Sequence, residues 1–132
     1  MPESRHYLWD RIAECGVLTA LTRADRFGVI AIKSRSIPRH IRYLRQMGLM
    51  DRLAGERPLE MSVAETASGD RTLERMIAIG RELKDKDGAG AIVMGCAGMA
   101  RHRRPLELEL GIPVIDPTQA AVTMAIGTLA VR

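Results

Sequence analysis

Two short and wholly apolar runs, residues 29–32 and 91–94, constrain the fold of this chain most strongly. Each follows a segment in which apolar residues recur with helical spacing, residues 11–26 and 70–87. An uninterrupted apolar run of about four residues is typical of a strand that is covered on both faces. The alternation of such runs with helical segments therefore predicts βαβ units joined into a parallel sheet.

The remaining elements follow from weaker signals. Residues 59–63 alternate between apolar and polar, which predicts a less buried strand after a connector at 55–58. Residues 112–115 form another short strand, and Pro113 places it near an edge of the sheet. Further helices are expected at residues 37–47, 98–110 and 117–130.

These elements predict an α/β fold, a three-layer α/β/α unit around a short, mostly parallel four-stranded sheet. We expect residues 1–132 to form a single α/β domain, in which residues 1–11 stay unassigned. The last helix is rich in alanine and methionine and almost without a polar face, so we expect both of its sides to be covered.

Composition limits the class of protein. No apolar run approaches the roughly 20 residues that span a bilayer, and the polar N-terminus lacks the pattern of a secretory signal. With only Cys15 and Cys96, a disulfide framework is not expected, so we predict a cytoplasmic protein with reduced thiols. Cys15 lies within the first helical pattern and is interpreted as a packing residue.

The net charge of +4 is interpreted as a basic surface rather than as a nucleic-acid interface. Basic residues are interleaved with acidic ones, and the cluster at residues 101–104 contains no aromatic side chain that could stack on a base. We therefore expect no nucleic-acid partner and no membrane partner.

Cys96 is the strongest candidate for chemistry. It follows the apolar run 91–94 and is flanked by small residues, which lets a ligand approach both the sulfur and the backbone. In open parallel sheets, ligands bind beyond the carboxyl ends of the strands. We expect the free amides of Ala97, Gly98 and Met99 to point at this position, where they would favour a thiolate and hold an anion. The alternative is a cysteine that is only a small buried apolar residue.

Two other strand ends are polar, residues 33–36 and residues 65–68. Arg35 and Arg39 could hold a carboxylate, although a solvated helix start explains them equally well. The histidines, at positions 6, 40 and 102, show no ligand spacing with either cysteine, and no glycine-rich phosphate loop is present. We therefore expect neither a metal nor a cofactor.

Residues 88–100, which contain the motif GCAGM, are similar to the second cysteine motif of the aspartate/glutamate/hydantoin racemase superfamily. The continuation 110–116, with the motif GIPVID, and the upstream run 24–30 match the same pattern. The resemblance covers roughly residues 12–130, and the subgroup it resembles most is that of hydantoin and allantoin racemases.

The resemblance implies two pseudo-symmetric halves that face each other across a cleft, each with one cysteine. One thiolate removes a proton from the stereogenic carbon of an amino-acid-like, hydantoin-like or allantoin-like substrate, and the other thiol reprotonates the opposite face, without a cofactor. Cys96 corresponds to the cysteine of the second half. The substrate-binding positions that the resemblance and the site pattern imply are Lys33, Ser34, Arg35, Ser36, Gly95, Ala97, Gly98 and Met99.

A first half with its own cysteine does not precede this segment, so the resemblance implies an incomplete racemase unit. It would require a homo-oligomer or a missing N-terminal half as its partner. The family packs the last helix against its first half, so without that half the helix would lose part of its cover, and its apolar surface could drive dimerisation instead. Two alternatives remain open: a decarboxylase-like lyase that works with a single cysteine, and a non-catalytic module for small-molecule binding or assembly.

Overall fold

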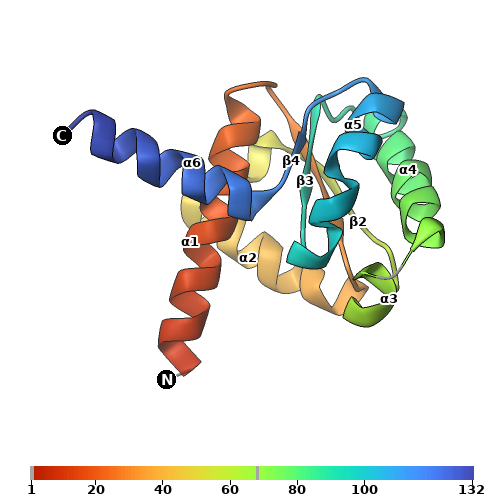
Figure 1. Ribbon diagram of the computed structural model, residues 1–132, viewed down its shortest axis with the longest axis horizontal. Coiled ribbons are helices and arrows are strands. Elements are labelled where there is room, and N and C mark those ends of the chain that lie inside the picture. Colours follow the sequence, from red (N-terminus) through yellow and green to blue (C-terminus); the bar gives the residue numbers. More distant parts are fainter. Residues whose placement is uncertain (1, 68) are drawn as a thin grey trace.

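The computed structural model describes residues 2–67 and 69–132, which form a four-stranded sheet with helices around it (Figure 1). The strands lie in the order β2 (Leu53–Pro58), β1 (Phe27–Ala31), β3 (Ala91–Met94) and β4 (Val114–Ile115). Every adjacent pair is parallel. The predicted α/β class is confirmed, and the sheet is parallel throughout rather than mostly so.

The two inner strands are the two apolar runs of the sequence. Every residue of β1 and β3 is buried, because each strand has a neighbour on both sides and helices above and below. Ile30 and Ile92 point into one core, whereas Val29 and Val93 point into the other. This alternation follows from the two-residue period of a strand.

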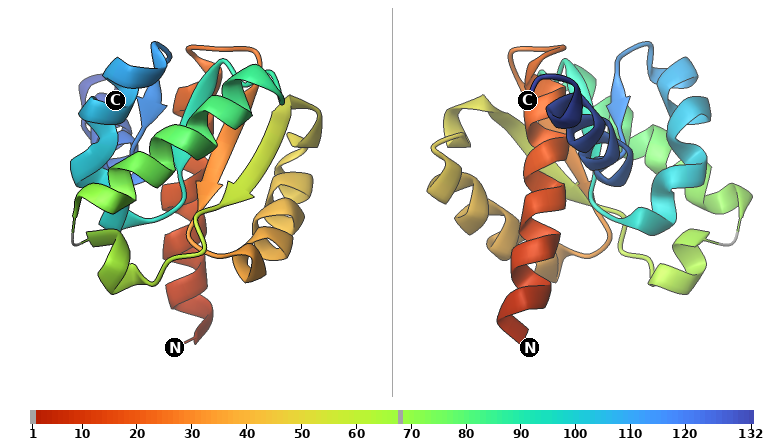
Figure 2. Two further views of the ribbon diagram at one scale, coloured as in Figure 1. Left: turned by 90° about the vertical axis from the view of Figure 1, so that its right-hand side faces the viewer. Right: turned by 60° about the vertical axis from the view of Figure 1, so that its left-hand side comes forward.

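Helices cover both faces of the sheet and produce the predicted three layers (Figure 2). On one face lie α1 (Pro2–Leu21) and α2 (Ile37–Met47), with α6 (Pro117–Ala130) packed across α1. On the other face lie α3 (Val63–Ala67), α4 (Asp70–Asp85) and α5 (Arg103–Leu110). Short 3-10 turns complete the chain: η1 (Ser34–Ser36), η2 (Met50–Arg52) and η3 (Ala97–His102).

The edge strand β2 corrects the sequence analysis, which placed a strand at 59–63 and a connector at 55–58. The strand ends at Pro58, and Leu59 lies just beyond it, fully buried, with its amide donating to the carbonyl oxygen of Ala31 at 2.8 Å. Residues 53–58 carry no alternating apolar pattern. This edge strand is instead stabilised by its pairing with β1 and by side-chain ion pairs.

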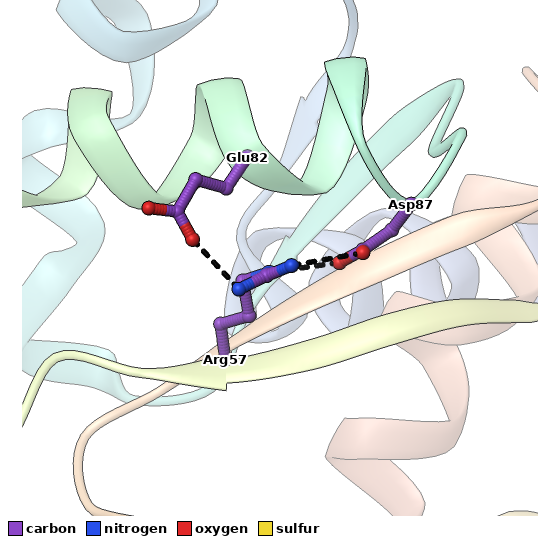
Figure 3. Close-up of polar contacts among 3 residues, drawn as sticks. All are labelled: Arg57, Glu82 and Asp87. Carbon is purple, nitrogen blue, oxygen red and sulfur yellow. Dashed lines mark hydrogen bonds and ion pairs between the residues drawn. The ribbon is translucent and has the colours of Figure 1, made fainter.

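Arg57 supplies those ion pairs (Figure 3). Its Nε and Nη2 donate to the two carboxylate oxygens of Asp87, at 2.9 and 3.0 Å, and its Nη1 donates to Glu82 at 2.6 Å. The guanidinium thereby ties β2 to the end of α4 and to the loop that follows. A two-pronged arginine–carboxylate pair of this kind fixes the geometry of the contact as well as adding energy.

Two other boundaries differ from the predictions. Helix α1 begins at Pro2 and ends at Leu21, whereas the sequence analysis started it at residue 11 and ended it at 26. The polar stretch expected as a strand-end loop at 65–68 contains instead the end of α3, with Ser68 outside the described residues. Short polar helices such as α3 lack the apolar period by which longer ones are found.

The last helix is less covered than the sequence analysis expected. Asp116 caps it by accepting the amide of Thr118 at 3.1 Å, and Ala120 packs into the core. Beyond that turn its large apolar side chains are exposed, so the expectation that both sides are covered is wrong for the chain alone. None of the helices in the part of the chain described is both long and apolar enough to cross a membrane.

Candidate functional site

Cys96 lies where the chain leaves the carboxyl end of β3 and enters η3. Its backbone is extended and the residue is half-buried. The amide of Gly98 donates to its Sγ at 3.4 Å, and the amide of Met99 donates to its carbonyl oxygen at 3.1 Å. Main-chain contacts therefore hold the sulfur at the rim of the sheet, as the sequence analysis placed it.

Gly95 sets the position of Cys96. Its amide donates to the carbonyl oxygen of Ile30 at 2.8 Å, which extends the pairing of β3 with β1 by one residue. A Cβ at this position would lie 2.5 Å from the same oxygen and 3.3 Å from the Cα of Ala31. Glycine is needed here because two backbones approach each other closely.

A cleft of about 190 Å³ opens beside Cys96. Its walls come from α1, α2, the inner strands β1 and β3, and the start of α6. The lining is mostly apolar, and its polar side chains are those of Asp10, Arg39, His40, Tyr43, Asp116 and Thr118. A concave, largely apolar site with a few polar groups suits a small molecule.

His40 enters the cleft wall from α2 and contacts Glu56 of β2 through its Nδ1. The side chains are 11% and 1% exposed, so the pair is withdrawn from water. Burial raises the pKa of Glu56 above its ordinary value, and the hydrogen bond and charge of His40 lower that pKa only in part. The imidazole of His40 therefore stands in the same cleft wall as the thiol, and the buried carboxyl of Glu56 contacts it.

Tyr43 lies one turn further along α2 and fixes this helix to α1. Its hydroxyl donates to Glu14 at 2.8 Å, and Arg11 donates to the same carboxylate oxygen at 2.7 Å. Burial and the hydrogen bond to Glu14 raise the pKa of the phenol, so it stays protonated at physiological pH. Tyr43 is thus suited to donate a hydrogen bond rather than to act as a base.

The predicted site residues fall into two places. Gly95, Cys96 and Ala97 line the cleft together, Gly98 contacts the sulfur, and the side chain of Met99 is buried in the core. The amide of Met99 does not point freely at a ligand, since it donates to Cys96.

The loop of Lys33, Ser34, Arg35 and Ser36 follows β1 but is not part of the cleft lining among the described residues. It is tied instead to the end of β2, because the amide of Ser34 donates to the carboxylate of Glu60 at 2.7 Å. Hydrogen bonds from the side chain and from the amide of Ser34 lower the pKa of Glu60. Substrate binding by this loop stays a prediction.

Sequence reasoning missed the polar groups that α2 brings to the cleft. The sequence pattern indicates for Arg39 either a carboxylate ligand or a solvated helix start, and for His40 no ligand spacing with either cysteine. The signal that could have found them is their spacing, because His40, Tyr43 and Leu44 recur three and four residues apart on one helical face. The partner Glu56 carries no such signal, since its strand was not recognised.

The arrangement is suited to moving protons. A thiol, an imidazole and a phenol line one cleft, and groups of these kinds can act as general acids and bases. No cluster of three or more His, Cys, Asp or Glu side chains with metal-ligand geometry occurs among the described residues.

Comparison with known proteins identifies the family. The sequence profile described as Asp/Glu/Hydantoin racemase matches residues 11–125. The chain belongs to this family. It is 35% identical over 116 residues to the hydantoin racemase of Paenarthrobacter aurescens, a match that covers 86% of this chain and 49% of the relative. The hydantoin racemase of Rhizobium meliloti is also 35% identical, over 115 residues and 48% of its length.

Solved racemase structures share the fold. The allantoin racemase of Pseudomonas fluorescens superposes with a TM-score of 0.85 and 28% identity, covering 90% of this chain and 51% of that one. For the allantoin racemase of Klebsiella pneumoniae the TM-score is 0.81 and the identity 33%, over 90% and 49% of the two chains. The chain therefore spans about half the length of the racemases it matches.

Proposed function

We propose that the chain supplies Cys96 as a thiol acid–base group for cofactor-independent proton transfer at the stereogenic carbon of a small substrate. The observation that carries this proposal is the half-buried sulfur at the carboxyl edge of the sheet, in the wall of a cleft of small-molecule size. The family supports an isomerase, and the names of the relatives favour a hydantoin-like or allantoin-like substrate over other amino-acid derivatives.

The proposed step is an abstraction of the proton on the stereogenic carbon by the Cys96 thiolate. The S–H bond forms as the C–H bond breaks, and the electron pair of the C–H bond delocalises into the neighbouring carbonyl group of the substrate. The negative charge then grows on the carbonyl oxygen, where main-chain amides can stabilise it. We place that role on the amide of Ala97, which lines the cleft beside the sulfur, because the amides of Gly95 and Gly98 already donate to Ile30 and to the Sγ of Cys96.

Racemisation needs a second acid that delivers a proton to the opposite face of the carbanion. Among the described residues of the cleft lining, Cys96 is the one thiol, and Cys15 packs with the aliphatic core on that side of the sheet. We propose that the second thiol comes from another chain, either a second copy of this one or a protein that carries the other half. Activity should therefore rise with protein concentration.

The test follows proton removal and loss of chirality separately. A single enantiomer of a 5-substituted hydantoin, of allantoin and of aspartate is incubated with the protein in D₂O. Deuterium at the stereogenic carbon is measured by proton NMR, and optical activity by circular dichroism. We expect the wild-type protein to exchange this proton faster than the uncatalysed reaction does. The rate of exchange should fall at least about 100-fold in Cys96→Ser. Cys15→Ala is the matched control and should retain the wild-type rate.

Equal exchange in the wild type and in Cys96→Ser would contradict the proposal. So would the absence of both exchange and loss of optical activity with all three substrates at high protein concentration. The second result would favour a non-catalytic binding or assembly module.

One observation favours a second function, a decarboxylase-like lyase: the described cleft contains a single thiol. One thiol can protonate a carbanion from one side only, so a prochiral malonate would lose CO₂ and give a single enantiomer. A racemase instead gives a racemic product. Chiral chromatography of the product from an arylmalonate substrate therefore separates the two functions.

A further inference from the structure

We propose that His40, held by Glu56, is a second acid–base group of the cleft that Cys96 lines. In this arrangement Glu56 is a positioning residue, which acts through the imidazole. The proposal deepens the proposed function and rests on it for the role of the sulfur. It assigns a proton-holding group to this chain that does not depend on any partner.

The position of Glu56 in the sheet is the first argument. Its register partner in β1 is Val29, and Val29 and Leu44 of α2 belong to the aliphatic core on this face of the sheet. A carboxyl group at 1% exposure among such neighbours costs stability unless a partner compensates it. Within the described residues its Oε1 has no hydrogen-bond partner, so His40 at Oε2 is the main compensation.

The second argument is the orientation of the imidazole. Because Nδ1 is engaged by Glu56, we assign proton exchange with a ligand in the cleft to Nε2, the other ring nitrogen, which is buried. Burial raises the pKa of Glu56, so its carboxyl group titrates closer to the range of an imidazole than an exposed carboxyl group does. Because the two groups share this hydrogen bond, the charge state of Glu56 affects how firmly the imidazole holds a proton.

The effects of the other charged and titratable groups of the cleft must be distinguished from the effect of this pair. These groups are Asp10 of α1, Arg39 and Tyr43 of α2, and Asp116 at the start of α6, with Glu14 behind Tyr43. A change in the reactivity of Cys96 that depends on both His40 and Glu56 is therefore assigned to this pair.

The experiment measures how fast iodoacetamide alkylates Cys96 as a function of pH, in a Cys15→Ala background so that one thiol is read. We expect the wild-type rate to show a step between about pH 5 and 8, in addition to the ionisation of the thiol itself. His40→Gln should abolish that step. Glu56→Gln keeps the shape of the pair but removes the charge that favours the imidazolium, so the step should move down by about 1 pH unit.

Arg42→Gln is the matched control, since Arg42 is exposed on the same helix and should leave the profile unchanged. Far-ultraviolet circular dichroism verifies that each variant is folded. If His40→Gln is unfolded, the proposal is tested by the alkylation profile of Glu56→Gln and by a ¹⁵N NMR titration of the His40 ring in the wild type. Identical profiles in the wild type, His40→Gln and Glu56→Gln would overturn the proposal. No substrate is present, so this failure is distinct from a failure of the racemase assay.

Discussion

The carboxylate of Asp87 holds the edge strand β2 to the rest of the protein. It accepts two hydrogen bonds from Arg57 of β2, and its side chain is 20% exposed (Figure 3). The bond from Arg57 holds the pKa of Asp87 below its ordinary value of 3.8. The exposed pair of Arg81 and Glu109, with both side chains more than half exposed, is a natural contrast.

We expect Asp87→Asn to lower the free energy of unfolding by about 1–2 kcal/mol at neutral pH. Because the pKa is depressed in the folded chain, the contribution of the carboxylate is complete above about pH 4 and is lost as the pH falls through the folded value. Urea denaturation at a series of pH values should therefore show the difference between the wild type and Asp87→Asn shrinking in acid. Glu109→Gln should differ from the wild type by less than about 0.5 kcal/mol at every pH. A pH-independent difference for Asp87→Asn would contradict this account.

Among the elements, the inner strands could be predicted from the sequence and the edge strand could not. β1 and β3 are buried on every side, and burial on both faces leaves an apolar run in the sequence. β2 contains Gly55, Glu56 and Arg57, whose places depend on contacts with α2, α4 and the loop after α4. Such contacts join residues far apart in the chain, so no local pattern reports them.

The same difference between local and long-range contacts explains which residues of the candidate site could be predicted from the sequence. Cys96 could be located because the strand, the small residues and the turn that expose it are adjacent in the sequence. The pair of His40 and Glu56 could not, because it joins a helix to a strand that was not recognised. Local geometry is visible in a sequence, whereas a tertiary pair of single residues is not.

The junction of β3 with η3 makes a prediction of its own. Gly95→Ala places a Cβ against the carbonyl oxygen of Ile30, where neither backbone can yield without separating β1 from β3. We expect a loss of about 1–3 kcal/mol in the free energy of unfolding and an altered alkylation rate of Cys96. Gly127→Ala in α6, where a Cβ meets nothing, should instead be neutral or slightly stabilising. Equal thermal denaturation midpoints for the two variants would contradict this view of the junction.

At the scale of the whole molecule, the two faces of the sheet differ in how completely they are closed. The face under α4 and α5 encloses the larger aliphatic core, whereas α6 lies across α1 and extends away from the sheet (Figure 1). Val122, Ile126 and Leu129 are spaced four and three residues apart and are 56%, 63% and 63% exposed. They form a continuous apolar stripe on one side of the helix.

The stripe on α6 is suited to a second copy of the chain, which would also bring a second Cys96 into the assembly. We expect size-exclusion chromatography with light scattering to show a dimer whose population rises with concentration. The double variant Ile126→Glu and Leu129→Glu should shift it to the monomer with an unchanged monomer fold, because neither side chain is buried in its own chain. Leu108→Glu is the matched control, since Leu108 is 76% exposed on α5, away from the stripe. A monomer at every concentration, or an equal effect of Leu108→Glu, would contradict dimerisation through α6. The partner that covers this helix would then be a separate protein that carries the other half.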